Sequence, residues 1–199
     1  MKKIRFVLLL LSLSFATLVH AQQQNEGIVC QFDGSAAPTA DIQVANAAPI
    51  ALNRVSDILN TVGLKKNFSV LAASVDNAGA IIKGSSRYIL YNPYFMAKVD
   101  NASQTDWSSY SILAHEIGHH LNGHTIQAGG SSYNAELEAD EFSGFVLRKL
   151  GATLGEAQSA IAMLATNEGS DTHPGRAPRL NAIAAGWNKA DQQMRGLAI

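Results

Sequence analysis

Side chains able to bind a metal are concentrated in one short stretch of the chain. Four of its six histidines lie within residues 111–124, SILAHEIGHHLNGH. His115 and His119 are four residues apart, so on a helix they project from one face, about 6 Å apart along the axis, and can bind one ion. Glu116 lies one residue further round the helix, where it can act as a general base on a metal-activated water. The stretch fits the HExxH pattern and predicts a metal site on a helix.

The other two histidines of this stretch are not expected to be metal ligands. His120 follows His119 directly and therefore points about 100° away round the helix. His124 invites comparison with the longer HExxHxxGxxH pattern, which requires glycine at position 122 and histidine at 125. The chain has Asn122 and Thr125 there. Because the spacing along the chain determines whether the side chain reaches the metal, we reject His124 as the third ligand.

A third ligand is expected from the acidic segment AELEADEF, residues 135–142. A catalytic zinc normally has three protein ligands and one open position. Glu136 and Asp140 are four residues apart and share a helix face, whereas Glu138 and Glu141 point elsewhere. We predict Glu136 as the third ligand and Asp140 as the acceptor for the N–H of a ligand imidazole. The alternative is an acidic helix start that only compensates the helix dipole.

Three motifs together resemble a known family. HEIGHH (115–120), ELEAD (136–140) and THPGRAPR (172–179) are similar to motifs of the gluzincin peptidases in the group that contains the prenyl-protein endopeptidase and the membrane-bound heat-shock peptidase. Soluble periplasmic relatives share these motifs, and the resemblance covers about residues 68–187. It implies a zincin-like fold and one Zn²⁺ per chain. The residues that it implies are His115, His119 and Glu136 as zinc ligands, Glu116 as the base and Asp140 as the aspartate of the second motif.

The resemblance also implies roles for two late residues. His173 and Pro174 precede Arg179, as a histidine–proline pair precedes an arginine in the family. His173 is then expected to act in catalysis, by binding substrate or stabilising the oxyanion, and Arg179 to bind substrate. The alternative for His173 is a loop cap. The chain lacks the membrane helices of the namesake members, so their prenyl-protein substrate is not expected.

The elements that position these residues read as a helix-rich α+β domain with a small antiparallel sheet. β-branched and aromatic residues predict strands near 68–74, 80–84 and 87–91, and 88–91 are a candidate for pairing with an extended substrate, with a core strand as the alternative. Thr153 and Glu156 match a capping box. Helices are expected at 48–62, 107–123, within 131–151, from 153 to 164 and at 176–194.

The beginning of the chain reads as a targeting segment. Residues 1–21 have basic residues, an apolar run of about 14 residues and small residues before Ala21, which is the pattern of a signal peptide. The run is shorter than the roughly 20 residues of a membrane span. We expect a signal peptide at 1–21, a flexible leader at 22–40 and the metallopeptidase domain at 41–199. The chain would be exported to the periplasm or the medium, with an uncleaved anchor as the alternative.

Composition and motifs together favour an enzyme. The net charge of −1 and 16% charged residues give no basic surface for nucleic acid, and no membrane span is expected in the mature chain. We predict a zinc-dependent metalloendopeptidase that acts on protein or peptide substrates in periplasmic protein turnover or quality control. The alternatives are a non-catalytic zinc-binding scaffold, a secreted interaction module and a zinc hydrolase of non-peptide amides. Glu116 favours the enzymes, because a scaffold has no need of a base.

Overall fold

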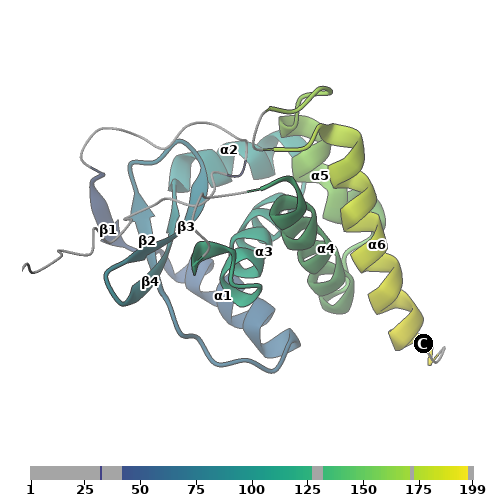
Figure 1. The fold of residues 1–199 in the computed structure, drawn as a ribbon, viewed down its shortest axis with the longest axis horizontal. Helices are drawn as coiled ribbons and strands as arrows, with labels where there is room; N and C mark the ends of the chain where they lie inside the picture. The colour runs from purple at the N-terminus through teal and green to yellow at the C-terminus, as the bar shows by residue number, and fades with distance from the viewer. Residues whose placement is uncertain (1–31, 33–41, 127–131, 171–172, 197–199) are drawn as a thin grey trace, which may run out of the picture.

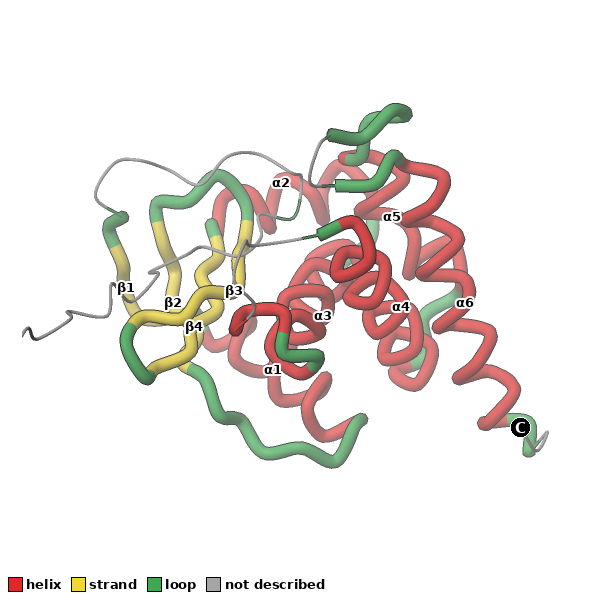
Figure 2. The backbone as a smooth tube through the Cα atoms, in the orientation of Figure 1, coloured by secondary structure: helices red, strands yellow, loops and turns green. Residues whose placement is uncertain are grey.

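The computed structural model describes residues 32, 42–126, 132–170 and 173–196. Within them the chain forms six α-helices, a short 3₁₀ helix and a four-stranded sheet, which confirms the expected helix-rich α+β fold. The expected signal peptide and, apart from Phe32, the expected leader lie outside the described residues. In Figure 2 the sheet forms one side of the domain and most of the helices form the other.

The sheet is mixed, so the expectation of an antiparallel sheet is wrong at one pair of strands. The strands are β1 (Val44–Asn46), β2 (Ser69–Ala73), β3 (Ala78–Lys83) and β4 (Ser86–Tyr91), in the order β1-β2-β4-β3. β2 and β4 are parallel, whereas the other two pairs are antiparallel. After β2 the chain passes to β3 at the edge of the sheet and then returns as β4, which lies between β2 and β3. Because β4 is antiparallel to β3, it runs parallel to β2.

The position of β4 in the sheet also corrects the expectation about substrate pairing. β4 pairs with β2 on one side and with β3 on the other. Residues 88–91 therefore have no open edge for an extended peptide, and the core-strand alternative is confirmed, with Ile89 fully buried. The edge strand next to the histidine helix is β3, which contacts that helix.

The helices follow the sequence-based expectation with one exception. A capping box at Thr153 and Glu156 is present as expected. One helix was not expected, because Pro93 read as the end of a strand. It is also the first residue of a helix, which Asn92 caps by accepting hydrogen bonds from the backbone N–H groups of Tyr94 and Phe95. The helices are α1 (Pro49–Thr61), α2 (Pro93–Ser103), α3 (Trp107–Leu121), α4 (Tyr133–Leu150), α5 (Leu154–Leu164) and α6 (Arg176–Met194).

Helix α3 is the centre of the domain. It lies between the sheet and the pair α4–α6 in Figure 1, and it contacts α1, α2, α4, α5, β3 and β4. Its apolar side chains belong to the main hydrophobic core: Ile112, Leu113, Ala114 and Ile117. Burying these side chains on all sides of the helix leaves the histidines of α3 at the centre of the molecule and not on its surface.

Two glycines let α4 and α6 pack at very close distance. A Cβ atom on Gly186 would lie 1.8 Å from the carbonyl oxygen of Glu141, and one on Gly144 would lie 2.0 Å from that of Ile183. No side chain fits in either place, so glycine is required at both. The close contact fixes α6, which carries Arg179, against α4, which carries Glu136 and Asp140.

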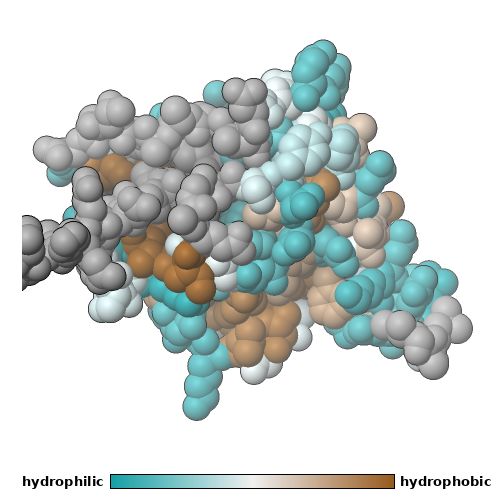
Figure 3. Space-filling model, viewed as in Figure 1, coloured by the Kyte–Doolittle hydropathy of each residue, from teal (hydrophilic) through white to brown (hydrophobic). Residues whose placement is uncertain are grey.

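The surface is mixed in character. Figure 3 shows a hydrophobic area at the lower edge of this face and hydrophilic residues toward the C-terminal end of α6. Among the described helices, none combines the length and the apolar character that crossing a membrane requires.

Candidate metal centre

The structure brings together the three residues that the sequence predicted as metal ligands. His115 and His119 come from successive turns of α3, and Glu136 comes from the first turn of α4. The two Nε2 atoms are 3.0 Å apart, and oxygens of Glu136 lie 3.3 Å from Nε2 of His115 and 3.5 Å from Nε2 of His119. All three side chains are fully buried. This cluster could hold one metal ion.

Local sequence explains why α4 presents Glu136 at this place. Ser132 caps the helix by accepting a hydrogen bond from the backbone N–H of Ala135. The carboxylate of Glu136 therefore lies at the positive end of the helix dipole. A Cβ atom on Gly118 would lie 3.1 Å from Cα of Ala139, so glycine at 118 allows α4 to approach the histidine face of α3.

The pKa values of Glu136 and His119 shift toward the protonation states of a metal site, whereas that of His115 shifts the other way. Burial opposes ionisation of Glu136, but its hydrogen bond to His115 and the neighbouring histidines lower its pKa far below the usual range. Burial and the charge of His115 lower the pKa of His119. Burial also lowers the pKa of His115, but the carboxylates of Asp140 and Glu136 outweigh it and raise that pKa to about 9. A cation bound here replaces the proton that His115 otherwise holds between these carboxylates.

Asp140 and Arg179 support His115 from behind. Since Nε2 of His115 faces the other ligands, its Nδ1 carries the hydrogen and donates to Oδ1 of Asp140 at 2.9 Å. Arg179 holds Asp140 with two hydrogen bonds, from Nε at 2.7 Å and from Nη2 at 3.0 Å. Asp140 thus lies where an acceptor for a ligand imidazole was predicted. The guanidinium of Arg179 is buried against Asp140 and orients it, so a role in substrate binding stays a prediction.

Glu116 is buried next to the cluster with both carboxylate oxygens available. Neither oxygen has a hydrogen-bond partner of normal geometry among the described residues. Burial raises the pKa of Glu116 to about 8; the charge of Glu136 adds to this shift, while His115 and the backbone of Ala80 oppose it. A buried carboxylate without a hydrogen bond of normal geometry calls for an explanation, and a role in proton transfer would provide one.

His173 reaches the same cluster from the loop before α6. Its Nε2 atom is 3.3 Å from Oε2 of Glu136, and its side chain is buried. A tight turn holds it there: the N–H of Ser170 donates to the carbonyl of His173, and Gly169 pairs with Pro174. The predicted catalytic role of His173 is therefore compatible with its place, and it stays a prediction.

His120 lies on α3 and His124 lies just beyond its C-terminal end. The surroundings of both differ from those of the candidate ligands. His120 stacks on Phe68 and donates from Nε2 to the carbonyl oxygen of Tyr88 at 3.0 Å, so it joins α3 to the sheet. Burial lowers the pKa of His120. His124 lies beyond Gly123, in the 3₁₀ helix η1 (His124–Ile126), and neither histidine belongs to the ligand cluster.

Sequence reasoning missed two contacts of His124. Its Nδ1 atom lies 3.0 Å from Nδ1 of His119, and its Nε2 atom lies 3.0 Å from Oε2 of Glu138. As expected, Glu138 does not belong to the candidate ligand cluster, but the expectation missed its contact with His124. No helical periodicity could reveal the contact, because Gly123, with φ of 74°, turns the chain back between the two histidines.

Phe32 is a further residue that the sequence did not single out. Its ring packs edge-on against His115, with centroids 5.2 Å apart, and lies 5.1 Å below the guanidinium of Arg179. Its backbone N–H donates to the carbonyl of Ala78 on β3, and its carbonyl accepts from Arg179. Phe32 therefore closes one side of the cluster.

Comparisons of the chain with protein-family models, curated proteins and solved structures gave no match. A function is therefore inferred from the motifs and from this geometry.

Proposed function

We propose that the protein is a zinc-dependent metalloendopeptidase. The observation that carries this proposal is Glu116, a buried carboxylate with available oxygens beside two histidines and a glutamate that converge on one point. A scaffold that only binds metal has no need of such a group. The similarity of the three motifs to the gluzincin peptidases supports the same conclusion.

The donor set of the cluster suits zinc. Catalytic zinc sites with two histidines and one glutamate are well known, with bonds of about 2.0–2.2 Å in a tetrahedral arrangement, so neighbouring ligand atoms lie about 3.3–3.5 Å apart. Here the two Nε2 atoms are 3.0 Å apart, Oε2 of Glu136 is 3.3 Å from His115, and Oε1 of Glu136 is 3.5 Å from His119. Three protein ligands also leave one position open. Two nitrogen donors and one carboxylate suit zinc better than magnesium or calcium, which prefer oxygen ligands.

The side chains around the cluster divide the work of hydrolysis. When bound, zinc acts as a Lewis acid that activates water and polarises a carbonyl group. Glu116 accepts the proton of the attacking water and delivers it to the leaving amine, for which its carboxylate oxygens beside the cluster are placed. His173, on the Glu136 side of the cluster, is our candidate for a hydrogen-bond donor to the oxygen that gains charge.

The sheet supports a peptide as the substrate. β3 is the edge strand beside α3, and the backbone of its residue Ala80 interacts with Glu116. Main-chain pairing with an exposed edge strand is a common way to hold an extended peptide. At this edge the backbone N–H of Phe32 donates one hydrogen bond to the carbonyl of Ala78. A non-peptide amide would undergo the same chemistry, and we keep such a hydrolase as the second candidate.

The pattern of residues 1–21 supports export, and we propose that the enzyme works in the periplasm or the medium, in protein turnover or quality control. No nucleic acid partner is proposed.

Metal analysis and one substitution test the function. The chain without residues 1–21 should bind about one zinc per molecule, and a peptide library should reveal cleavage sites. Glu116→Gln should retain zinc while cleavage falls by about 10²–10⁴-fold, which is the usual contribution of a general base. Glu141→Gln is the control, because Glu141 is a partly exposed glutamate of α4 outside the cluster. A protein that binds no zinc would contradict the whole proposal, and an active Glu116→Gln variant would contradict the role of Glu116.

A further inference from the structure

We propose that His124 and Glu138 are positioning residues for the metal ligand His119, an inference that rests on the proposed zinc site. The side chains form a continuous row: Nδ1 of His119 is 3.0 Å from Nδ1 of His124, and Nε2 of His124 is 3.0 Å from Oε2 of Glu138. His124 is almost fully buried, with 3% of its surface exposed. Its two ring nitrogens are both in use, one toward the ligand and one toward the carboxylate.

Metal binding allows only one arrangement of hydrogens along this row. A metal at Nε2 of His119 requires the lone pair of that atom, so the hydrogen of the neutral ring is on Nδ1. Nδ1 of His124 must then accept it, and the hydrogen of His124 must be on Nε2. Nε2 lies beside Glu138, and a carboxylate only accepts. Every donor thus meets an acceptor, so the row selects the tautomer of His119 that can bind a metal through Nε2.

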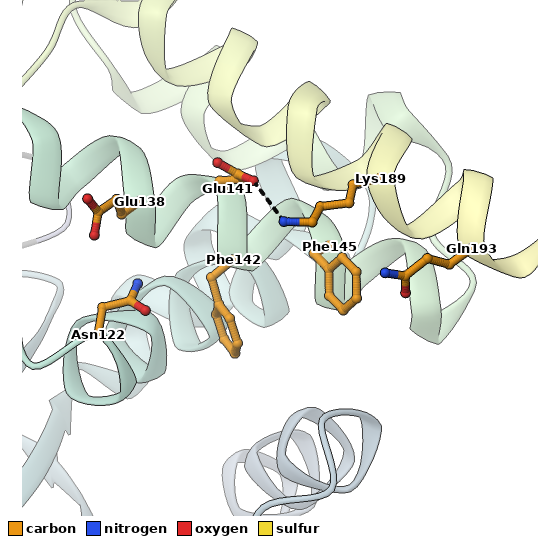
Figure 4. A pocket seen from close by; sticks show the side chains of 7 residues that line it. All are labelled: Asn122, Glu138, Glu141, Phe142, Phe145, Lys189 and Gln193. Carbon is orange, nitrogen blue, oxygen red and sulfur yellow. Dashed lines mark ion pairs between the residues drawn. The ribbon is translucent and has the colours of Figure 1, made fainter. Parts of the chain in front are cut away.

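The fold brings this row together from three places. Gly123, in the left-handed region with φ of 74°, reverses the chain after α3, so His124 returns to the side of His119. Glu138 follows Glu136 by two residues and faces another side of α4. Residues of α4 and α6, with Asn122, line a groove of about 350 Å³. Figure 4 shows Glu138 at one end of it, with Asn122 nearby. With 60% of its side chain exposed, Glu138 is the solvent end of the row.

The competing explanation is that His124 only anchors the turn after α3. The two explanations differ in what they require at the position of Nδ1. A turn anchor needs only a side chain that fills the space, whereas a positioning residue needs a hydrogen-bond acceptor for His119. Asparagine places its Oδ1 atom near the position of histidine Nδ1, and leucine fills similar space without an acceptor.

Zinc affinity of the full set of variants tests the inference. We would measure the zinc dissociation constant of the chain without residues 1–21 by competition with a chromogenic chelator, and the visible spectrum of the cobalt-substituted protein. His124→Leu should weaken zinc binding by about 10–100-fold, as the loss of hydrogen-bond partners of metal-bound histidines does. His124→Asn should recover most of this loss. Glu138→Gln should weaken binding by less than about tenfold, because an exposed amide still accepts.

Controls separate positioning from folding. Glu141→Gln, on the same helix and partly exposed, should leave the affinity unchanged. Urea unfolding of the metal-free variants shows whether a side chain only supports the turn. If the leucine and asparagine variants lose zinc affinity equally, or if the leucine variant binds as tightly as the original chain, the positioning role is wrong. Should the leucine variant fail to fold, the other two variants decide. The positioning role is wrong if the asparagine variant loses most of its zinc affinity, or if Glu138→Gln weakens zinc binding by more than about tenfold. An original chain that binds no zinc overturns the proposed function itself, whereas normal zinc binding that His124→Leu leaves unchanged overturns only this inference.

Discussion

The two candidate histidine ligands of α3 are supported in opposite ways. Behind His115 lies the Asp140 arm, in which Asp140 accepts from His115 and Arg179 holds Asp140 with two hydrogen bonds. Behind His119 lies the His124 arm, made of His124 and Glu138. The Asp140 arm is buried to its end, and the His124 arm ends in solvent.

This difference sets how each arm can fail. A buried ion pair contributes little net stability when it is complete, but removing one partner leaves a buried charge that is costly. An exposed carboxylate can be replaced by water at small cost. We therefore expect changes in the Asp140 arm to affect both folding and metal binding, and changes at Glu138 to affect metal binding alone.

The largest effect is expected for Arg179→Met. The substitution keeps the length of the side chain but removes the buried guanidinium that makes two hydrogen bonds to Asp140, which should lower the free energy of unfolding by about 3–5 kcal/mol. Urea unfolding of the metal-free protein measures it. The matched control is Lys189→Met: Lys189 also lies on α6 and pairs with a carboxylate of α4, Glu141, but both side chains are about half exposed. That change should cost less than about 1 kcal/mol. Equal losses would mean that burial does not distinguish the two pairs.

The next largest effect is expected for Gly186→Ala, which tests whether the close packing of α6 on α4 holds Arg179 in place. Gly186→Ala places a methyl group where the carbonyl of Glu141 lies 1.8 Å away, so the helices must separate. We expect a loss of about 1–3 kcal/mol in the free energy of unfolding, as for other overpacked interiors. Zinc affinity should also fall, because Arg179 moves with α6. Gly155→Ala, where the added methyl meets no atom within 4 Å, is the control and should not destabilise the protein. An unchanged Gly186→Ala variant would show that the close packing is not needed.

A smaller effect on metal binding compares the two arms directly. Asp140→Asn keeps an acceptor for His115 but removes the charge, and zinc binding should weaken by about 10–100-fold. The corresponding change in the other arm, Glu138→Gln, should weaken binding less, because Glu138 is exposed. Chelator competition on both variants gives the ratio. A larger loss for Glu138→Gln would reverse our view of which arm matters more.

The candidate ligands could be predicted from the sequence because their geometry is local. In a helix, residues four apart share a face whatever surrounds the helix, so His115 and His119 had to converge once α3 formed. The same rule placed Glu136 and Asp140 on one face of α4, and both now face α3. The capping box at Thr153 is equally local and was also found.

Contacts that depend on the path of the chain could not be predicted in this way. The contact of His124 with His119 follows from the left-handed turn at Gly123, and the partner of Arg179 follows from the packing of α6 on α4. The parallel pairing of β2 with β4 is of the same kind, because strands of similar composition do not encode their order in the sheet. The start of α2 was missed for another reason, since Pro93 suits both the end of a strand and the start of a helix.

The sequence by itself determined the donor types and their spacing along two helices: an HExxH pair with its glutamate, and a second acidic helix. Only the tertiary structure decided that α4 lies against α3 at Gly118, that Arg179 pairs with Asp140, and that His124 lies between His119 and Glu138. The physical reason is range. Helical periodicity fixes directions within about one or two turns, whereas the meeting of two helices is decided by the burial of apolar faces and by close backbone contacts between segments distant in sequence.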